Sequence, residues 1–218
     1  MSRYAPILQE VAGRLCGQAP SLMRLDPVRW AYAVRDAVSL AQPDLVVSHY
    51  DESLEADAIH AAAGPGLHEL PALAAVEPTA RAVELVRVLA EIYATPGSPA
   101  VAATVTGPAT VAARLCPLAP GVSEEELAEL AADLLAPLVG AYARAGAAVA
   151  IVFSRAPSDE RQIGPLRRAA DHHRIELAVV DRNEWRPLPA STPPESLRRS
   201  AAGSDRTLAN HHRRSGNR

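Results

Sequence analysis

Four short β-rich runs alternate with helical segments along the chain, and this order most constrains the fold. The runs are DLVVSHYD at 44–51, VAATVTG at 101–107, AVAIVFS at 148–154 and ELAVVD at 176–181. Each is rich in apolar and β-branched residues, as is typical of strands buried inside a parallel sheet. Because helical segments separate the runs, we predict an α/β fold with about four parallel strands built from β-α-β units.

Several segments carry helix signals. An apolar period precedes Gly17 at Ile7, Leu8, Val11, Ala12 and Leu15. Asp26 followed by Pro27 predicts a helix start, because an acidic N-cap and a proline in the first turn suit that end. The residues expected to face the core from this second helix are Trp30, Val34, Ala37 and Val38. A further amphipathic helix is predicted over 78–93.

The clearest helix signal begins at Ser123, which forms a capping box with Glu126. Apolar residues then trace one helical face at Leu127, Leu130, Leu134, Leu138 and Tyr142. Pro137 is expected to kink this helix and Gly146 to end it.

Length and composition limit the class of protein. With 218 residues the chain is shorter than a complete eight-stranded α/β barrel, which typically needs about 250. Hydrophobic residues at 48% and charged residues at 22% are ordinary for a globular protein. No apolar run is long enough for a membrane span, and the first residues do not resemble a leader peptide. We therefore expect a cytoplasmic protein without membrane contact.

The pattern of strands and helices ends near Val180, and a different composition begins at Trp185. Residues 185–218 contain seven arginines against two acidic residues and almost no large apolar residues. We therefore predict two parts, an α/β domain over 1–184 and a disordered basic tail over 185–218. A basic tail can contact a nucleic acid or the acidic body of the protein, or it can be a solvated segment without a partner. We favour the solvated segment and do not expect a nucleic-acid partner.

Three segments together resemble one enzyme superfamily. They are SHYDESLEADA at 48–58, VTGPATVAARL at 105–115 and YARAGAAVAIVFS at 142–154. Their order and spacing are similar to those of the uroporphyrinogen decarboxylase superfamily, which also contains the corrinoid and coenzyme M methyltransferases. The resemblance covers about residues 3–155 and implies a (β/α) barrel, here an incomplete one. It implies a ligand of the tetrapyrrole, corrinoid or methyl-donor type, and carboxy-lyase or methyltransferase chemistry if the chain is an enzyme.

The resemblance assigns a role to Asp51. In the decarboxylases, an aspartate after the second strand binds the pyrrole N–H groups and stabilises the cation formed when a pyrrole is protonated. Asp51 aligns with that residue, so the resemblance makes it the candidate catalytic residue. A carboxylate in a dry barrel mouth stabilises positive charge much better than one in water. An aspartate at a strand end can equally cap the following helix, and the sequence leaves both roles open.

Two motifs of the superfamily are missing. The decarboxylases bind substrate carboxylates with an N-terminal Arg-Gln-x-Gly-Arg motif, whereas GRLCGQAP at 13–20 lacks its arginine pair. The zinc ligands of the methyltransferases, a His-x-Cys and a later Cys, are also missing, and the spacings of the histidines fit no common metal site. We therefore expect no metal and no other cofactor. Catalysis stays open, and the alternative is a catalytically degenerate half-barrel that binds a ligand or a partner.

Polar residues at the predicted strand ends supply the candidate binding site. In a parallel α/β fold the carboxyl ends of the strands form the functional edge. The candidates for ligand binding at this edge are His49, Tyr50, Thr106, Gly107, Ser154, Arg155 and Asp181. Such a mixture of acids, arginine and hydroxyls suits a polar or anionic small molecule. An open four-stranded sheet would also leave apolar edges, so we expect a homo-oligomer or a complementing subunit.

Overall fold

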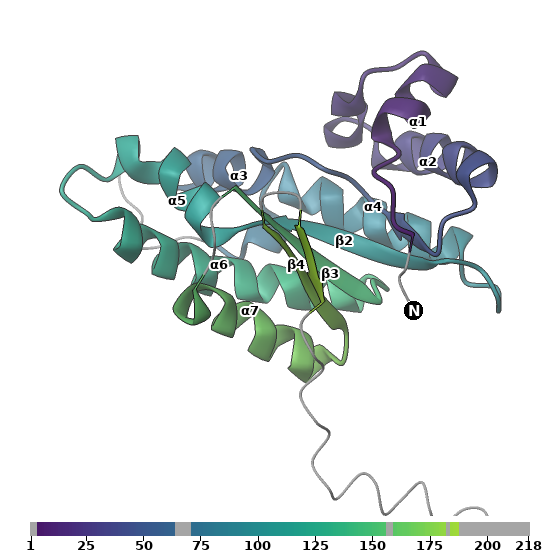
Figure 1. Cartoon of the computed structure of the whole chain (residues 1–218). Coiled ribbons are helices and arrows are strands. Elements are labelled where there is room, and N and C mark those ends of the chain that lie inside the picture. Colours follow the sequence, from purple (N-terminus) through teal and green to yellow (C-terminus); the bar gives the residue numbers. More distant parts are fainter. Residues whose placement is uncertain (1–3, 64–70, 156–158, 182–183, 188–218) are drawn as a thin grey trace, which may run out of the picture. The chain divides into compact units, whose positions relative to one another are not determined.

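The computed structural model describes residues 4–63, 71–155, 159–181 and 184–187 (Figure 1). The chain divides into two units, Met1–Leu188 and Pro189–Arg218, and the described residues all belong to the first. In these residues the α-helices are α1 (Gln9–Cys16), α2 (Pro27–Ala41), α3 (Leu54–Ala62), α4 (Thr79–Ile92), α5 (Pro108–Leu115), α6 (Glu124–Arg144) and α7 (Glu160–His173). Short 3₁₀ helices are η1 (Pro20–Arg24), η2 (Leu73–Ala75) and η3 (Cys116–Leu118). The strands are β1 (Leu45–Val47), β2 (Ala100–Thr106), β3 (Val149–Ser154), β4 (Glu176–Asp181) and β5 (Glu184–Pro187).

The strands form one sheet in the order β1-β2-β3-β4-β5. The first four pair in parallel, with Leu45 opposite Ala100, Ala102 opposite Val149, and Val149 opposite Glu176. The predicted α/β fold with four parallel strands is therefore confirmed. Each of these strands is joined to the next through at least one helix, as a parallel connection requires.

A fifth strand lies where the sequence pattern predicted the start of a disordered tail. β5 pairs antiparallel with β4, placing Trp185 opposite Val180 and Pro187 opposite Ala178. Pairing along the free edge of β4 satisfies backbone groups whatever the side-chain pattern, which explains why apolar periodicity does not reveal this strand. The rest of the predicted tail, 188–218, lies outside the described residues.

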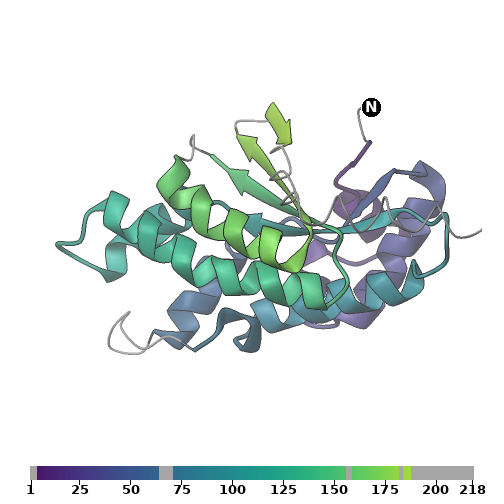
Figure 2. The ribbon, with the colours of Figure 1, turned by 90° about the horizontal axis from the view of Figure 1, so that it is seen from below.

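The sheet carries its helices on one face. Val101, Ala103 and Val105 of β2 belong to the large core formed with the helices. The alternate residues of the strands form a second apolar cluster, comprising Leu45, Val47, Ala102, Val149 and Ile151. Figure 2 shows α6 and α7 packed along one side of the sheet. The fold is thus a mixed sheet of four parallel strands and the antiparallel β5, with its strands in sequential order and its helices on a single face.

The N-terminal segment lies along the outer edge of β1. The carbonyl oxygen of Tyr4 accepts hydrogen bonds from the backbone N–H groups of Asp44 and Leu45, at 2.9 and 3.4 Å. The backbone N–H of Tyr4 donates to Asp44 Oδ2 at 2.8 Å. This segment therefore covers the first backbone groups of the edge strand.

The local helix signals correspond to helix ends in the structure. Asp26 caps α2 by accepting the backbone N–H of Arg29 at 2.9 Å. Ser123 and Glu126 form the predicted capping box of α6. This helix continues through Pro137 to Arg144 and is followed by Gly146, whose φ of 104° few other residues would adopt.

Only part of the apolar period before Gly17 is buried. Leu8 and Ala12 are buried, whereas Ile7, Val11 and Leu15 are exposed. The helix packs against η1 and α2, so only one narrow side of it meets the core. None of the helices in the described part of the chain has the length and apolar content needed to cross a bilayer.

Candidate functional site

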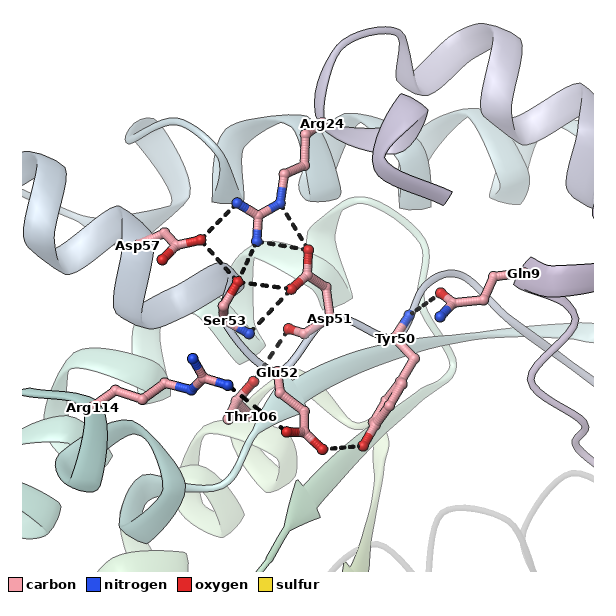
Figure 3. A network of polar contacts seen from close by, with 9 residues as sticks. All are labelled: Gln9, Arg24, Tyr50, Asp51, Glu52, Ser53, Asp57, Thr106 and Arg114. Carbon is pink, nitrogen blue, oxygen red and sulfur yellow. Dashed lines mark hydrogen bonds and ion pairs between the residues drawn. The ribbon is translucent and has the colours of Figure 1, made fainter. Parts of the chain in front are cut away.

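The carboxyl ends of β1, β2 and β3 meet at one edge of the sheet, and most of the predicted site residues lie there. The loop from β1 to α3 contributes residues 48–53. β2 ends at Thr106 and is followed by Gly107, and β3 ends at Ser154. Figure 3 shows the polar contacts around the first loop. This edge contains two groups of side chains, one around Arg24 and one around Glu52.

Arg24, at the end of η1, binds three acceptors of the β1–α3 segment (Figure 3). Its guanidinium group donates to Asp51 Oδ2 at 2.7 Å, to Asp57 Oδ2 at 2.6 Å and to Ser53 Oγ at 2.7 Å. Partial burial alone would raise the pKa of Asp57, but hydrogen bonds from Arg24 and Ser53 hold that pKa below its ordinary value. Arg24 therefore neutralises part of an acidic cluster and fixes η1 to the loop.

Asp51 has structural partners on both carboxylate oxygens. Oδ2 is bound to Arg24, and Oδ1 accepts hydrogen bonds from the backbone N–H and the hydroxyl of Ser53, both at 3.1 Å. The carbonyl oxygen of Asp51 accepts hydrogen bonds from the backbone N–H of Leu54 at 3.2 Å and from Thr106 Oγ1 at 3.5 Å. The side chain therefore organises the turn that leads into α3, although the formal N-cap of this helix is Ser53.

A pocket of about 230 Å³ opens beside this loop. It is lined by Tyr50, Glu52, Thr110, Phe153, Ser154, Arg155 and Val180. The structure thus brings three predicted binding residues together, namely Tyr50, Ser154 and Arg155. Asp51, the predicted catalytic residue, is not among the lining residues.

Glu52 is the central charge of the pocket. Tyr50 Oη donates to Glu52 Oε1 at 2.5 Å, and Arg155 forms an ion pair with Glu52 Oε2. Arg114 of α5 approaches the same oxygen at 3.9 Å. The hydrogen bond from Tyr50, together with the Arg155 guanidinium, lowers the pKa of Glu52, whereas burial raises the pKa of Tyr50 to about 12. At neutral pH the pocket therefore holds a carboxylate and an intact phenol hydroxyl.

Gly107 sets the distance between the β2–α5 turn and the end of β3. Its backbone N–H donates to the carbonyl oxygen of Phe153 at 2.6 Å, and a Cβ at this position would lie 2.7 Å from the Cβ of Ser154. A side chain at residue 107 would therefore push the two strand ends apart. Next to this contact, Thr110 Oγ1 accepts the backbone N–H of Arg155 at 3.1 Å, which fixes the start of the Arg155 loop.

His49 is a buried residue and does not line this pocket. Its Nδ1 lies 2.8 Å from Ser48 Oγ, and its carbonyl oxygen accepts the hydroxyl of Thr104 at 2.8 Å. Burial lowers the pKa of His49 to about 4, so the ring is neutral at neutral pH. Its ring centroid lies 6.1 Å from that of Tyr142 of α6, on the helix side of the sheet.

Glu55 is an acidic residue at this edge that the strand-end argument did not select. Its side chain is 1% exposed, and Oε1 accepts the backbone N–H of Thr106 at 3.2 Å. Burial raises the pKa of Glu55 to about 7, with a smaller contribution from the charge of Asp51. The sequence pattern could have indicated this burial, because Glu55 shares the buried side of α3 with the apolar residues Leu54, Ala58 and Ile59.

Two further predictions concern the last strand and metal binding. Asp181 ends β4 opposite Ser154, so its backbone reaches the same edge of the sheet. Within the described residues, no group of three or more His, Cys, Asp or Glu side chains is arranged to hold a metal ion.

The fold and the site define an α/β protein with a polar pocket at the carboxyl edge of a parallel sheet. Comparison with protein-family models gives no match for the chain, and a search of curated proteins gives none either.

Proposed function

We propose that the chain binds a small polar molecule in the pocket at the carboxyl ends of β1, β3 and β4. The observation that carries this proposal is the convergence of Tyr50, Ser154 and Arg155 on one pocket from two separate segments of the chain. These groups provide hydroxyls and a guanidinium at a place where parallel α/β folds commonly bind ligands. The side chain of Arg155 is 73% exposed, so a ligand can reach it from solvent.

The class of ligand that we propose is a tetrapyrrole, a corrinoid or a methyl donor of the kind used by the uroporphyrinogen decarboxylase superfamily. The motifs at 48–58, 105–115 and 142–154 support it, and so do the sequential strand order and the helices on one face, which a segment of a (β/α) barrel would share. The pocket, at about 230 Å³, is smaller than the ~300–1,000 Å³ typical of ligand sites. It would hold a small ligand or one substituted ring of a larger one.

A second candidate is a catalytically inactive binding subunit, and the position of Asp51 favours it. A carboxylate that stabilises a substrate cation must face the substrate with its charge available. The Asp51 carboxylate is instead bound to Arg24 and Ser53. In this candidate the pocket binds its ligand, and the polar turn around Asp51 only shapes the loop.

Binding is tested by titrating the purified chain with uroporphyrin and with hydroxocobalamin, followed by the absorbance change of each probe. We expect saturable binding of one probe, weakened about tenfold or more in Arg155→Ala because a charge-assisted hydrogen bond is lost. Arg161→Ala is the matched control. Arg161 lies on α7, its side chain is 72% exposed, and it also pairs with glutamates. Equal affinity in both variants, or no binding of either probe, would contradict the proposal.

Turnover separates the two candidates. The chain is incubated with uroporphyrinogen, and mass spectrometry measures loss of CO₂. In a second incubation with a methyl-corrinoid and a thiol, mass spectrometry measures transfer of the methyl group. An active enzyme gives product that disappears in Asp51→Asn. Binding without product, unchanged in Asp51→Asn, supports the inactive subunit.

A further inference from the structure

Glu52 is held by groups from three separate segments of the chain. Tyr50 lies in the loop after β1, Arg114 lies on α5, and Arg155 follows β3. All three contact the carboxylate of Glu52, as Figure 3 shows for Tyr50 and Arg114. We call Tyr50, Arg114 and Arg155 the carboxylate cradle.

The chemistry of the cradle matches a carboxylate. Guanidinium groups and a phenol hydroxyl donate hydrogen bonds to carboxylate oxygens, and the charged donors give the stronger bonds. Burial raises the pKa of Tyr50 to about 12, so its hydroxyl keeps its proton and acts as a donor at neutral pH. Two guanidinium groups face the carboxylate of Glu52, and Arg114 also lies near enough to Asp57 to lower the pKa of that carboxyl.

The cradle also opens into the pocket. Tyr50, Glu52 and Arg155 line it together with the hydroxyl-bearing side chains of Thr110 and Ser154. The side chain of Glu52 is 19% exposed and sits in the turn between β1 and α3, whereas Arg155 is much more exposed. An anion that enters the pocket therefore meets Arg155 first and competes with Glu52 for it.

We infer that the ligand of this pocket carries a carboxylate group, and that Glu52 occupies the place of that group until the ligand displaces it. This inference rests on the proposed binding function and adds the chemical class of the ligand and an internal competitor. A cationic ligand is disfavoured, because it would have to approach Glu52 past Arg155, which lines the pocket and carries a like charge.

The inference predicts that neutralising Glu52 strengthens the binding of carboxylates. The probe is succinate, titrated by isothermal calorimetry at low ionic strength into the wild type and Glu52→Gln. We expect Glu52→Gln to bind succinate about ten- to a hundredfold more tightly, the range that one charge-assisted hydrogen bond spans. Adding Arg155→Ala to this variant should abolish the gain.

Glu125→Gln is the matched control, because it removes the same charge from an exposed ion pair with Arg161 on other elements. Glu52→Asp provides a second route if Glu52→Gln does not fold. It keeps the charge but is one methylene too short to hold its partners, so an intermediate gain is expected. Melting curves of all variants establish that they are folded.

Three results would decide the matter. The inference is supported if Glu52→Gln binds succinate more tightly than the wild type, Glu125→Gln does not, and adding Arg155→Ala to Glu52→Gln removes the gain. An equal gain in Glu125→Gln, or none in Glu52→Gln and Glu52→Asp, overturns it. If uroporphyrin or hydroxocobalamin binds the wild type in an Arg155-dependent way while Glu52→Gln gains nothing for succinate, the inference fails and the proposed function stands.

Discussion

Replacing Glu55 with Gln should change how the stability of the protein depends on pH. Glu55 lies on α3 and is buried against the end of β2. Its Oε1 accepts the backbone N–H of Thr106, whereas Oε2 has no hydrogen-bond partner among the described residues. Burial disfavours its charged form and raises its pKa from an ordinary value of 4.5 to about 7. Gln has nearly the same shape as protonated Glu and does not ionise in this range.

The sign and size of the effect follow from proton linkage. Between pH 4.5 and 7 the folded state keeps the proton of Glu55 while the unfolded state has lost it, so the free energy of unfolding falls as pH rises. The difference between the folded and unfolded pKa values of Glu55 corresponds to ~3 kcal/mol, at 1.36 kcal/mol per pKa unit. The free energy of unfolding of Glu55→Gln minus that of the wild type should therefore rise by about this amount between pH 4 and pH 8.

His49 acts in the opposite direction over the same interval. Its pKa falls from 6.5 to about 4 on folding, because burial disfavours the imidazolium. The unfolded state then binds the additional proton, so this group makes the protein more stable as pH rises from 4 to 6.5. The two contributions oppose each other in the wild type. In Glu55→Gln the free energy of unfolding should therefore rise with pH, and adding His49→Gln should remove that rise.

The measurement is urea denaturation followed by circular dichroism at intervals from pH 4 to pH 8. Glu125→Gln provides the control, since Glu125 is exposed on α6 and should leave the curve parallel to the wild type. Parallel curves for Glu55→Gln and the wild type over this whole range would refute the argument. In that case Glu55 would ionise with an ordinary pKa in the folded protein.

Three further substitutions test the packing around the site, each by urea denaturation. Arg24→Met should cost about 2 kcal/mol of unfolding free energy, because two neighbouring carboxylates lose their shared charged donor; an unchanged midpoint would mean that the cluster is solvated. Gly107→Ala should cost ~1–3 kcal/mol and weaken ligand binding, because the new Cβ displaces Ser154; full stability would show that the turn yields freely. Ser123→Ala should cost about 1 kcal/mol through loss of the α6 cap, with ligand affinity unaltered, and any change in affinity would contradict that separation.

Local sequence signals predicted the elements because their causes are local. The caps at Asp26 and Ser123 depend on groups within one turn of helix, so residue type and spacing suffice to identify them. The parallel strands follow from short apolar runs separated by helices. The strand-end rule then selected Tyr50, Ser154 and Arg155, which lie together in the pocket.

The remaining site residues depend on contacts between distant segments. Arg24 lies far from Asp51 in the sequence, and nothing in either segment shows that the two residues pair. Glu52 lies in a turn, and its role in the pocket depends on contacts with Arg114 and Arg155, which come later in the chain. Glu55 was missed for another reason, since glutamate is rarely buried and a helical glutamate is normally assigned to the exposed face.

The antiparallel strand β5 limits how this sheet can grow. It occupies the edge of β4 where the next parallel strand of a closed barrel would have to pair. At the opposite edge, β1 has three residues and the segment at Tyr4 already bonds beside it. A second protein could therefore extend the sheet into a parallel ring only by first displacing β5. That step would break the pairing between β4 and β5 and so would cost free energy. Association that leaves β5 in place would have to use other surfaces, such as the helices, the loops or the sheet face that carries the second apolar cluster, and would not close a parallel ring.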